Sequence, residues 1–231
     1  MVTVTRKVKS RLYDNAGREA QSEETRQRIL DAGRELIVER GYRSTTVAGI
    51  AGRAGVHVDT VYALVGRKPV LLRELIEQAV SGTDAPVTAE DREYVKAIEA
   101  EPDPARKLAI YAGAVRKIQA RMAPLLLALR DASATEPDAA EVWREISDRR
   151  AANMRKLAQD LEAADGLRAG LSIDEAADVI WATNSSELYV LLTVERGWPS
   201  DRYERWLADT WCRLLLPDTR PAHRRGVAEE T

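Results

Sequence analysis

The feature that most constrains this chain is a pair of short helical patterns between Thr45 and Gly66. Thr45 or Thr46 can cap the first pattern, which Gly55 ends, and the second pattern covers 57–64. Such short helices are marginal in water because nucleating a helix is costly, so both need longer partners to pack against. The buried stripe of the first pattern is Val47, Ile50, Ala51 and Ala54.

Longer helical patterns flank the short pair on both sides. The first covers 22–40, with Ser22 as its N-cap and Gly41 after its last turn, and another begins at Pro69, a residue suited to the first helical position. Two short helices joined by a glycine-containing turn match a helix-turn-helix unit, which presents its second helix to the DNA major groove. The apolar faces of the flanking helices are Ile29, Ala32, Leu36 and Ile37, then Leu71, Leu72, Leu75, Ile76 and Ala79.

The rest of the chain also has helical periodicity, and no alternating strand pattern stands out. The sequence therefore predicts an all-α fold, with an N-terminal three-helix helix-turn-helix domain and a C-terminal helical ligand-binding and dimerisation domain. Residues 81–103 are rich in Pro, Gly, Asp and Glu, which favours a linker or variable segment. The further helices are expected near 104–121, 123–133, 138–164, 172–196 and 200–216. The expected divisions are a flexible basic arm at 1–21, the DNA-binding domain at 22–82, the helical domain at 83–216 and a flexible tail at 217–231.

Charge is unevenly distributed along the chain. Residues 1–80 hold 14 Lys and Arg against 10 Asp and Glu, whereas the remainder holds 21 against 27. A basic N-terminal part is where a nucleic-acid surface is expected. The single cysteine, Cys212, excludes a disulfide framework and fits a reducing cytoplasm. No secretory leader and no apolar run long enough for a membrane helix is seen, so we expect a cytoplasmic protein without a membrane partner.

Motifs for catalysis or metal binding are missing from the sequence. The histidines are His57 and His223, and no Glu-x-x-His pair, HExxH, GxxxxGK[ST] or GxSxG motif occurs. We therefore expect no enzyme activity, no catalytic residue, no metal site and no cofactor.

The segment 41–72 resembles the tetracycline-repressor (TetR) family. The matching elements are Gly41-x-x-x-Thr45-Thr46, Ile50-Ala51-x-x-Ala54-Gly55-Val56, Thr60-Val61-Tyr62, and Lys68 with Leu71 and Leu72. Residues 181–217 resemble, more weakly, the last two helices of many members. The resemblance implies a dimeric DNA-binding regulator. The sequence departs from the family at His57, where a small hydroxyl residue is usual, and at Val65, where an aromatic residue is usual.

Base edges and phosphates are expected to contact different residues of this segment. The resemblance places Tyr62 and Lys68 at the phosphate backbone, whereas Thr46, at a helix N-terminus, and Arg53 have donors suited to phosphate. Because the base-reading set has few long donors, we expect thin base readout and a large contribution from DNA shape, with the basic arm in a minor groove. The base-reading candidates are His57, Val58, Asp59, Thr60 and Ala63.

Two further sites are expected in the C-terminal part. The helices near 172–196 and 200–216 are rich in Leu, Tyr and Trp, and the resemblance implies that they form a homodimer interface rather than pack only within one subunit. A pocket for a small hydrophobic or amphipathic effector is expected among helices at about 104–190. Its candidate residues are Tyr111, Gln119, Met122, Trp143, Asn153, Met154, Trp181 and Asn184.

The function expected from these observations is ligand-responsive regulation of transcription, most simply repression at a palindromic operator that the effector relieves. The effector would favour a dimer whose two DNA-binding domains are wrongly spaced, with the helix that begins at Pro69 linking the domains. The alternatives are a helical adaptor or scaffold and a helical-bundle enzyme.

Overall fold

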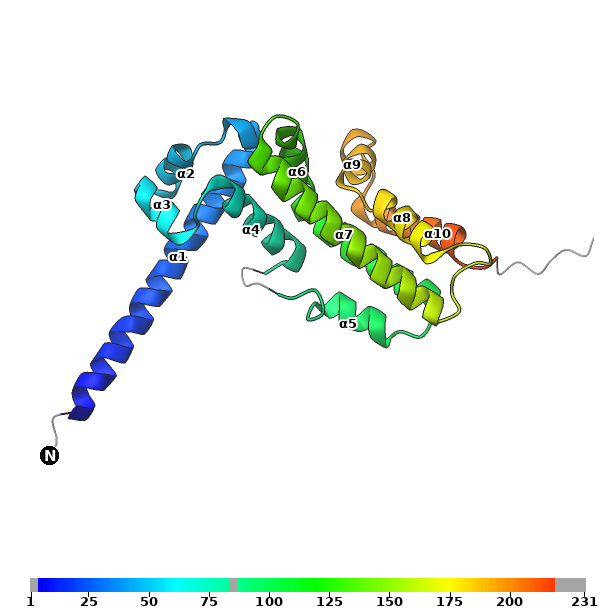
Figure 1. Ribbon diagram of the computed structural model, residues 1–231, viewed down its shortest axis with the longest axis horizontal. Coiled ribbons are helices and arrows are strands. Elements are labelled where there is room, and N and C mark those ends of the chain that lie inside the picture. The colour runs from blue at the N-terminus through cyan, green and yellow to red at the C-terminus, as the bar shows by residue number, and fades with distance from the viewer. Residues whose placement is uncertain (1–3, 84–86, 219–231) are drawn as a thin grey trace, which may run out of the picture. The chain divides into compact units, whose positions relative to one another are not determined.

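The structure is a computed structural model that describes residues 4–83 and 87–218, with no side-chain description for 4–16. These residues form helices and connecting turns without any strand, which confirms the all-α prediction (Figure 1). No helix within the described ranges has the length and apolar character needed to cross a membrane. The chain divides into two compact units, Met1–Thr88 with Lys117–Ser147, and Ala89–Arg116 with Asp148–Thr231.

The first unit contains the two short helices and their longer partners. These helices are α1 (Val4–Ser44), α2 (Val47–Ala54), α3 (Val58–Leu64) and α4 (Lys68–Ser81). They share one apolar core, to which α6 and α7 add residues from 122 to 146. The predicted apolar stripes lie in this core, since Ile29, Ile50, Leu72 and Leu75 are all fully buried.

Local signals in the sequence set the ends of these helices. The Thr46 side chain accepts a hydrogen bond from the Gly49 backbone N–H at 3.0 Å, which caps α2. Gly55 and Gly82 end α2 and α4 in the left-handed conformation, which glycine adopts without steric cost. Gly41 also leaves helical geometry, at φ 78°, so the regular part of α1 ends where the sequence predicted.

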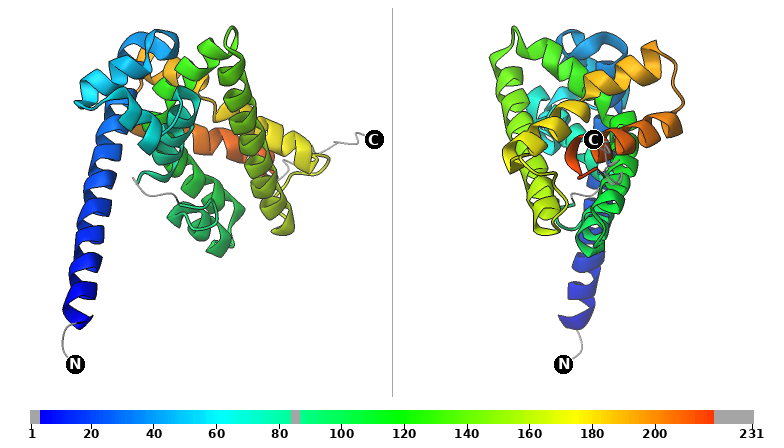
Figure 2. Two further views of the ribbon diagram at one scale, coloured as in Figure 1. Left: turned by 60° about the vertical axis from the view of Figure 1, so that its left-hand side comes forward. Right: turned by 90° about the vertical axis from the view of Figure 1, so that its right-hand side faces the viewer.

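The N-terminal segment differs from its prediction. Residues 1–21 were expected to form a flexible arm, yet α1 begins at Val4 and continues through this region without interruption. Its N-terminal half stands clear of α2, α3 and α4 in both views of Figure 2. The basic residues between 6 and 11 therefore lie in a helix, although the sequence of this segment shows no clear apolar face. Residues 1–3, and 219–231 of the predicted tail, lie outside the described residues.

The second unit is built from α5 (Glu93–Ala100), α8 (Ile173–Thr183), α9 (Ser186–Val190), the π-helix η1 (Leu191–Glu195) and α10 (Ser200–Leu215). The long helices α6 (Pro104–Ser133) and α7 (Pro137–Ala163) contribute one part to each unit. The core of the second unit includes the fully buried Tyr203, Leu207, Trp211 and Leu215 of α10. The predicted linker at 81–103 contains α5, whose Ile98 also enters this core.

Two predicted helix boundaries are wrong. The helices expected at 104–121 and 123–133 form the single helix α6, with Pro124 inside it. A proline inside a helix costs about 3 kcal/mol. Pro124 is exposed, whereas Ala123 and Leu125 beside it are fully buried, and this burial favours continuation. The helix expected at 172–196 is instead interrupted at Asn184, where α8 ends, and Ser185 caps α9.

The sequence predicted one division along the chain, after residue 82. The two compact units do not follow it, because α6 and α7 each contribute residues to both units. The functional boundary between residues 82 and 83 stays a prediction.

Candidate nucleic-acid interface

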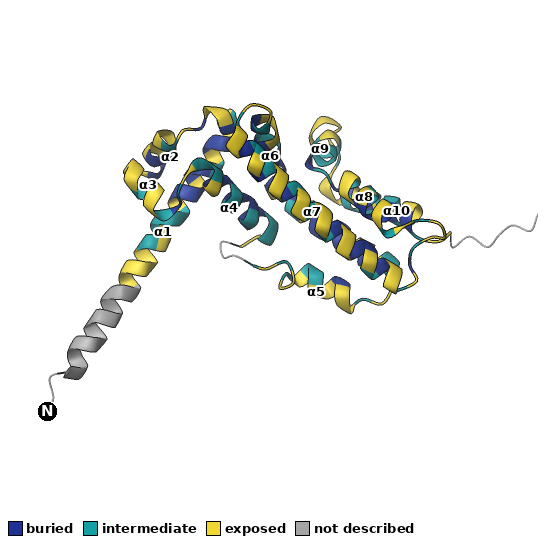
Figure 3. Cartoon of the chain, in the orientation of Figure 1, coloured by how far each residue is buried: buried dark blue, intermediate teal, exposed yellow. Residues whose placement is uncertain are grey.

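The helix α3 is anchored on one side and open on the other. Val61 is 1% exposed and Val65 is buried, so both hold α3 on the core of the first unit. Val58 is 37% and Tyr62 is 50% exposed, and Figure 3 colours much of α3 as exposed. His57, Asp59 and Ala63 are also exposed, and Thr60 is half-buried. The predicted base-reading residues therefore form an accessible face of α3.

The start of α2 adds a second accessible feature. Thr46 is exposed at the N-cap, whereas Thr45 before it is buried and donates its hydroxyl to the Gly41 carbonyl at 2.9 Å. The buried threonine fixes the turn, and the exposed one leaves the N-terminal N–H groups of α2 accessible. A helix N-terminus of this kind favours an anion, because its free N–H groups and its dipole both attract negative charge.

Two residues expected at the phosphate backbone are engaged inside the protein. Arg53 pairs with Glu35 at 2.8 Å and with Glu39 at 3.0 Å, which fastens α2 to α1. These hydrogen bonds raise the pKa of Arg53 and lower that of Glu39. The guanidinium is thus already matched with two carboxylates, so α2 keeps its angle to α1 while little positive charge is left for DNA.

Lys68 is held in a similar way at the start of α4. Its Nζ donates to the Tyr42 carbonyl at 3.0 Å, lies 3.9 Å from the centre of the Tyr42 ring, and is 3.7 Å from Glu136. The side chain is only 18% exposed. Lys68 therefore joins α4 to the end of α1, a role that local sequence cannot reveal because its partners lie far along the chain.

One cation near α3 was missed by the sequence reasoning. Arg67 is the exposed residue before α4 and follows the C-terminal end of α3 by a short turn. Its position directly before Lys68 could have revealed Arg67. The family resemblance names only the lysine, so Arg67 was not among the candidates.

The eight predicted effector-binding residues are divided between the two units. Gln119 and Met122 are buried in the first unit, where Trp143 packs against the core. Tyr111, Met154 and Asn184 are buried together in the second unit, where Asn153 is half-buried and Trp181 is 37% exposed. Asn184 Nδ2 donates to the Tyr111 hydroxyl at 2.9 Å and lies 3.1 Å from Met154 Sδ. Arg150, which was not predicted, donates to Asn184 Oδ1 at 2.6 Å.

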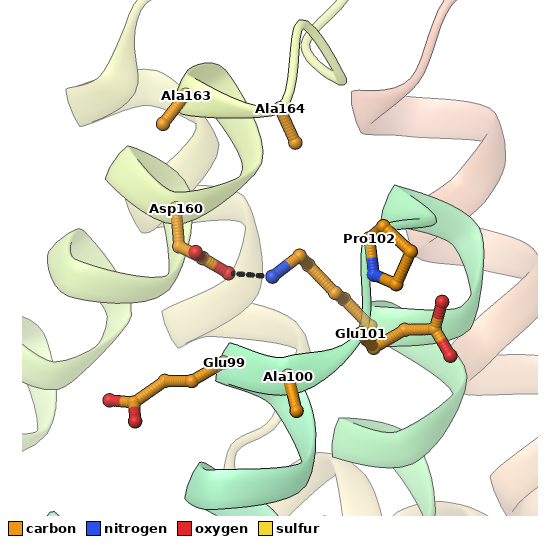
Figure 4. Close-up of a pocket in the computed structure, with 8 residues that line it drawn as sticks. Glu99, Ala100, Glu101, Pro102, Asp160, Ala163 and Ala164 are labelled. Atoms are coloured by element: carbon orange, nitrogen blue, oxygen red, sulfur yellow. Dashed lines mark ion pairs between the residues drawn. The ribbon is translucent and has the colours of Figure 1, made fainter.

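A surface hollow in the second unit lies elsewhere. It is lined by the end of α5 and the residues that follow it, by Lys107 of α6, and by the end of α7 (Figure 4). Lys107 pairs with Asp160 at 2.7 Å. Lys107 is buried and also donates to the Ile98 carbonyl, so this pair holds α5, α6 and α7 together. None of the eight predicted residues lines this hollow.

The large apolar residues expected at a dimer interface also separate into two sets, buried and exposed. Tyr203 and Trp211 are fully buried within the chain itself, and Trp211 Nε1 donates to Thr183 at 2.7 Å. For these two residues the expectation of an intersubunit contact is therefore wrong. The large apolar residues that remain exposed on η1 and α10 are Leu191, Val194 and Leu214.

The short helix α2 packs on the core of the first unit, and the next short helix, α3, has one face open to solvent. This arrangement defines the class of helix-turn-helix DNA-binding domains. Residues 29–75 match the family described as bacterial regulatory proteins, tetR family. The N-terminal helix-turn-helix segment is therefore similar to that of the TetR family. Members of this family are transcription factors rather than enzymes, which argues against the enzyme alternative.

Other known proteins are similar to this chain. An uncharacterised HTH-type transcriptional regulator, YvkB of Bacillus subtilis, is 41% identical over 54 residues, which are 23% of this chain and 29% of that protein. The chain thus matches less than a third of the length of this relative. Two solved structures share the fold over most of the chain. NalD, the secondary repressor of the MexAB-OprM multidrug efflux pump in Pseudomonas aeruginosa, has a TM-score of 0.66 at 22% identity and covers 87% of this chain and 100% of its own. SmeT in complex with triclosan has a TM-score of 0.66 at 19% identity and covers 85% and 93%.

Proposed function

We propose that this protein is a homodimeric transcriptional repressor that binds a palindromic operator and is released from it by a small hydrophobic or amphipathic effector. The observation that carries the proposal is the face of α3, where Val58 and Tyr62 are open to solvent while Val61 and Val65 are buried. Large apolar and aromatic side chains held open on a well-anchored helix need a binding partner, and this helix belongs to a DNA-binding domain.

The exposed residues suit a division between base and phosphate contacts. Val58 and Ala63 offer methyl groups for thymine, and His57 and Thr60 offer hydrogen bonds to base edges. Asp59 suits a cytosine N4 donor. Thr46 with the α2 N-terminus, Tyr62 and Arg67 suit phosphates, and we assign Arg53 and Lys68 to positioning α2 and α4 instead.

A second copy of the chain is the partner proposed for the apolar side of η1 and α10. Leu191, Val194 and Leu214 are 45%, 68% and 39% exposed, so a partner that covers them would gain free energy from their burial. An isologous dimer would cover them and would present two α3 helices to the two halves of a palindrome. The scaffold alternative gives no reason for an open α3.

Release by an effector requires a link between the two functions. NalD is a secondary repressor of a multidrug efflux pump and SmeT is solved in complex with triclosan, and the shared fold supports a comparable response in this chain. Arg121 of α6 donates Nε to the Ala79 carbonyl at 2.9 Å and so ties the last turn of α4 to α6. Because α6 also contributes to the second unit, a shift of α6 would move α4.

The test is selection of bound duplexes from a random DNA pool with the purified full-length chain. We expect enrichment of a palindrome, and we expect Tyr62→Ala to lower its affinity while Tyr94→Ala, in the second unit, does not. Absence of any enriched duplex at low salt would refute DNA binding. An enriched site without two-fold symmetry would refute the dimer arrangement, and the cytoplasmic location stays a separate prediction.

A further inference from the structure

The turn between α1 and α2 carries an exposed cation close to the start of α2. The Thr45 backbone N–H donates to the Tyr42 carbonyl at 3.2 Å and so closes a turn that contains Arg43. The Arg43 side chain is 65% exposed. Because consecutive Cα atoms are about 3.8 Å apart, those of Arg43 and Thr46 are at most about 11 Å apart. A phosphate at the N-terminus of α2 would therefore lie near Arg43.

Arg43 keeps its hydrogen-bond donors, in contrast to Arg53. The guanidinium of Arg53 donates to Glu35 at 2.8 Å and to Glu39 at 3.0 Å. Arg43 Nε lies 3.9 Å from Glu136 Oε1, which is too far for a hydrogen bond. Within the described residues its guanidinium donates no hydrogen bond. A guanidinium whose donors are available suits the oxygens of a phosphate.

The carboxylate that faces Arg43 comes from the turn between α6 and α7. Glu136 lies in this turn, directly before the first residue of α7, and its side chain is 32% exposed. Besides its contact with Arg43, it lies 3.7 Å from Lys68 Nζ at the start of α4. All three residues belong to the first unit. One carboxylate of the α6–α7 turn therefore faces cations that precede α2 and follow α3.

Glu136 and a DNA phosphate would compete for Arg43. Both groups are anions, so a phosphate that approaches the guanidinium is attracted by Arg43 and repelled by the carboxylate. An exposed ion pair of this length contributes little to stability, and the exchange of its carboxylate for a phosphate therefore costs little. The result of the competition depends on the distance between Glu136 and Arg43, and hence on the position of the α6–α7 turn.

We propose that Arg43 is a further phosphate-binding residue and that Glu136 restrains it, so that the position of the α6–α7 turn sets the affinity for DNA. This inference rests on the proposed function and deepens it, because it names a DNA contact and the group that regulates it. It adds a second route from α6 to the DNA-binding surface, beside the contact of Arg121 with the last turn of α4.

The first test measures the salt dependence of operator binding by the full-length chain, with fluorescence anisotropy on the selected duplex well below the melting temperature. Each phosphate contact contributes about 0.9 to the slope of log affinity against log salt concentration. Arg43→Gln should therefore lower the slope by about 0.9 per protomer, and Arg43→Lys should restore most of it because lysine keeps the charge. The control is Arg40→Gln, which removes a 60% exposed charge from α1 and should leave the slope unchanged.

The second test removes the restraining carboxylate. Glu136→Gln keeps the shape of the side chain and should raise the operator affinity by about threefold or more, since an exposed charge pair changes an equilibrium by up to about that factor. The gain should disappear in the Arg43→Gln background. The control is Glu141→Gln, which removes an exposed charge from α7 and should change the affinity by less than about twofold, because salt screens charges beyond about 8 Å.

The outcomes separate this inference from the proposed function. An unchanged slope in Arg43→Gln would overturn the phosphate contact. An unchanged affinity in Glu136→Gln, or an equal gain in the Arg43→Gln background, would overturn the restraint. Both results leave the proposed function intact, because the parent protein still binds the selected duplex. If selection enriches no duplex, the proposed function fails, and the slope on a mixed-sequence duplex at low salt still tests Arg43 because phosphate contacts do not depend on sequence.

Discussion

Two valines of α3 offer a matched test of the proposed interface. Val58 and Val61 lie one turn apart on the same helix, but Val58 is 37% exposed and Val61 is only 1% exposed. The same substitution, valine to alanine, should therefore affect different properties at the two positions. Val61→Ala is expected to lower stability, whereas Val58→Ala is expected to lower DNA affinity.

The magnitudes follow from burial. Val61→Ala removes two buried methyl groups at about 0.8 kcal/mol each and leaves a small cavity, so unfolding should become easier by about 2 kcal/mol. Val58→Ala removes exposed groups and should change the stability by less than about 0.5 kcal/mol. If Val58 covers a thymine methyl in each half-site, the loss on DNA is about 1 kcal/mol per protomer, or roughly 30-fold in Kd for the dimer.

Guanidinium unfolding followed by far-ultraviolet circular dichroism gives the stability, and fluorescence anisotropy on the selected duplex gives the affinity. The affinity is measured well below the unfolding transition, where both variants are folded. The reasoning is refuted if Val58→Ala unfolds as easily as Val61→Ala, or if it binds the duplex as tightly as the parent protein does.

Three further changes address individual contacts. Arg67→Gln should reduce the slope of log affinity against log salt concentration by about 0.9 per protomer, whereas Arg40→Gln on α1 should leave it unchanged; equal slopes would contradict a phosphate contact. Arg53→Gln should remove stabilisation that is present above the ordinary glutamate pKa and lost below it, because Arg53 lowers the pKa of Glu39. Urea unfolding across that pH range should then vary less in this variant, and an unchanged pH profile would exclude the ion pair. Ser172→Ala breaks the capping box with Glu175 and should destabilise the second unit by about 1 kcal/mol in thermal unfolding; an unchanged melting temperature would contradict this cap.

Sequence reasoning was most successful where one local signal determines one helix end. Thr46 and Gly55 cap α2, and the bounds of α2 and α3 and the start of α4 agree with prediction within about one residue. The buried stripe on α2 followed from its spacing alone. These features depend on neighbours in the chain, which a sequence displays directly.

The features that were missed depend on distant partners. Pro124 looked like a helix end, yet burial of its neighbours carries α6 past it. Asn184 looked like part of a continuous helix, yet its contacts with Arg150 and Tyr111 stabilise a break there. Arg53 looked available for phosphate because Glu35 and Glu39 lie on another helix.

The candidate sites were predictable to different degrees. The open face of α3 could be predicted in part, because helical spacing separates Asp59 and Ala63 from Val61, whereas Val58, three residues before Val61, lies at the edge of that face. The polar cluster of the second unit was found only in part, since Arg150 follows the charged stretch 141–149, which reads as a solvated surface. Its burial depends on the packing of α7 against α8, which no local pattern reveals.

The most direct test of the account places a DNA-cleaving probe on α3. Cys212→Ser removes the single cysteine, Ala63→Cys introduces one on the exposed face, and an iron chelate attached to it cleaves nearby DNA. A control carries the cysteine at the exposed Ala151 of α7. We expect the α3 probe to cut the selected duplex in two clusters separated by about one helical turn, or a multiple of it, and the control to cut nowhere specific. Equal cleavage by both probes, or none from α3, would contradict the assignment of this helix to the DNA groove.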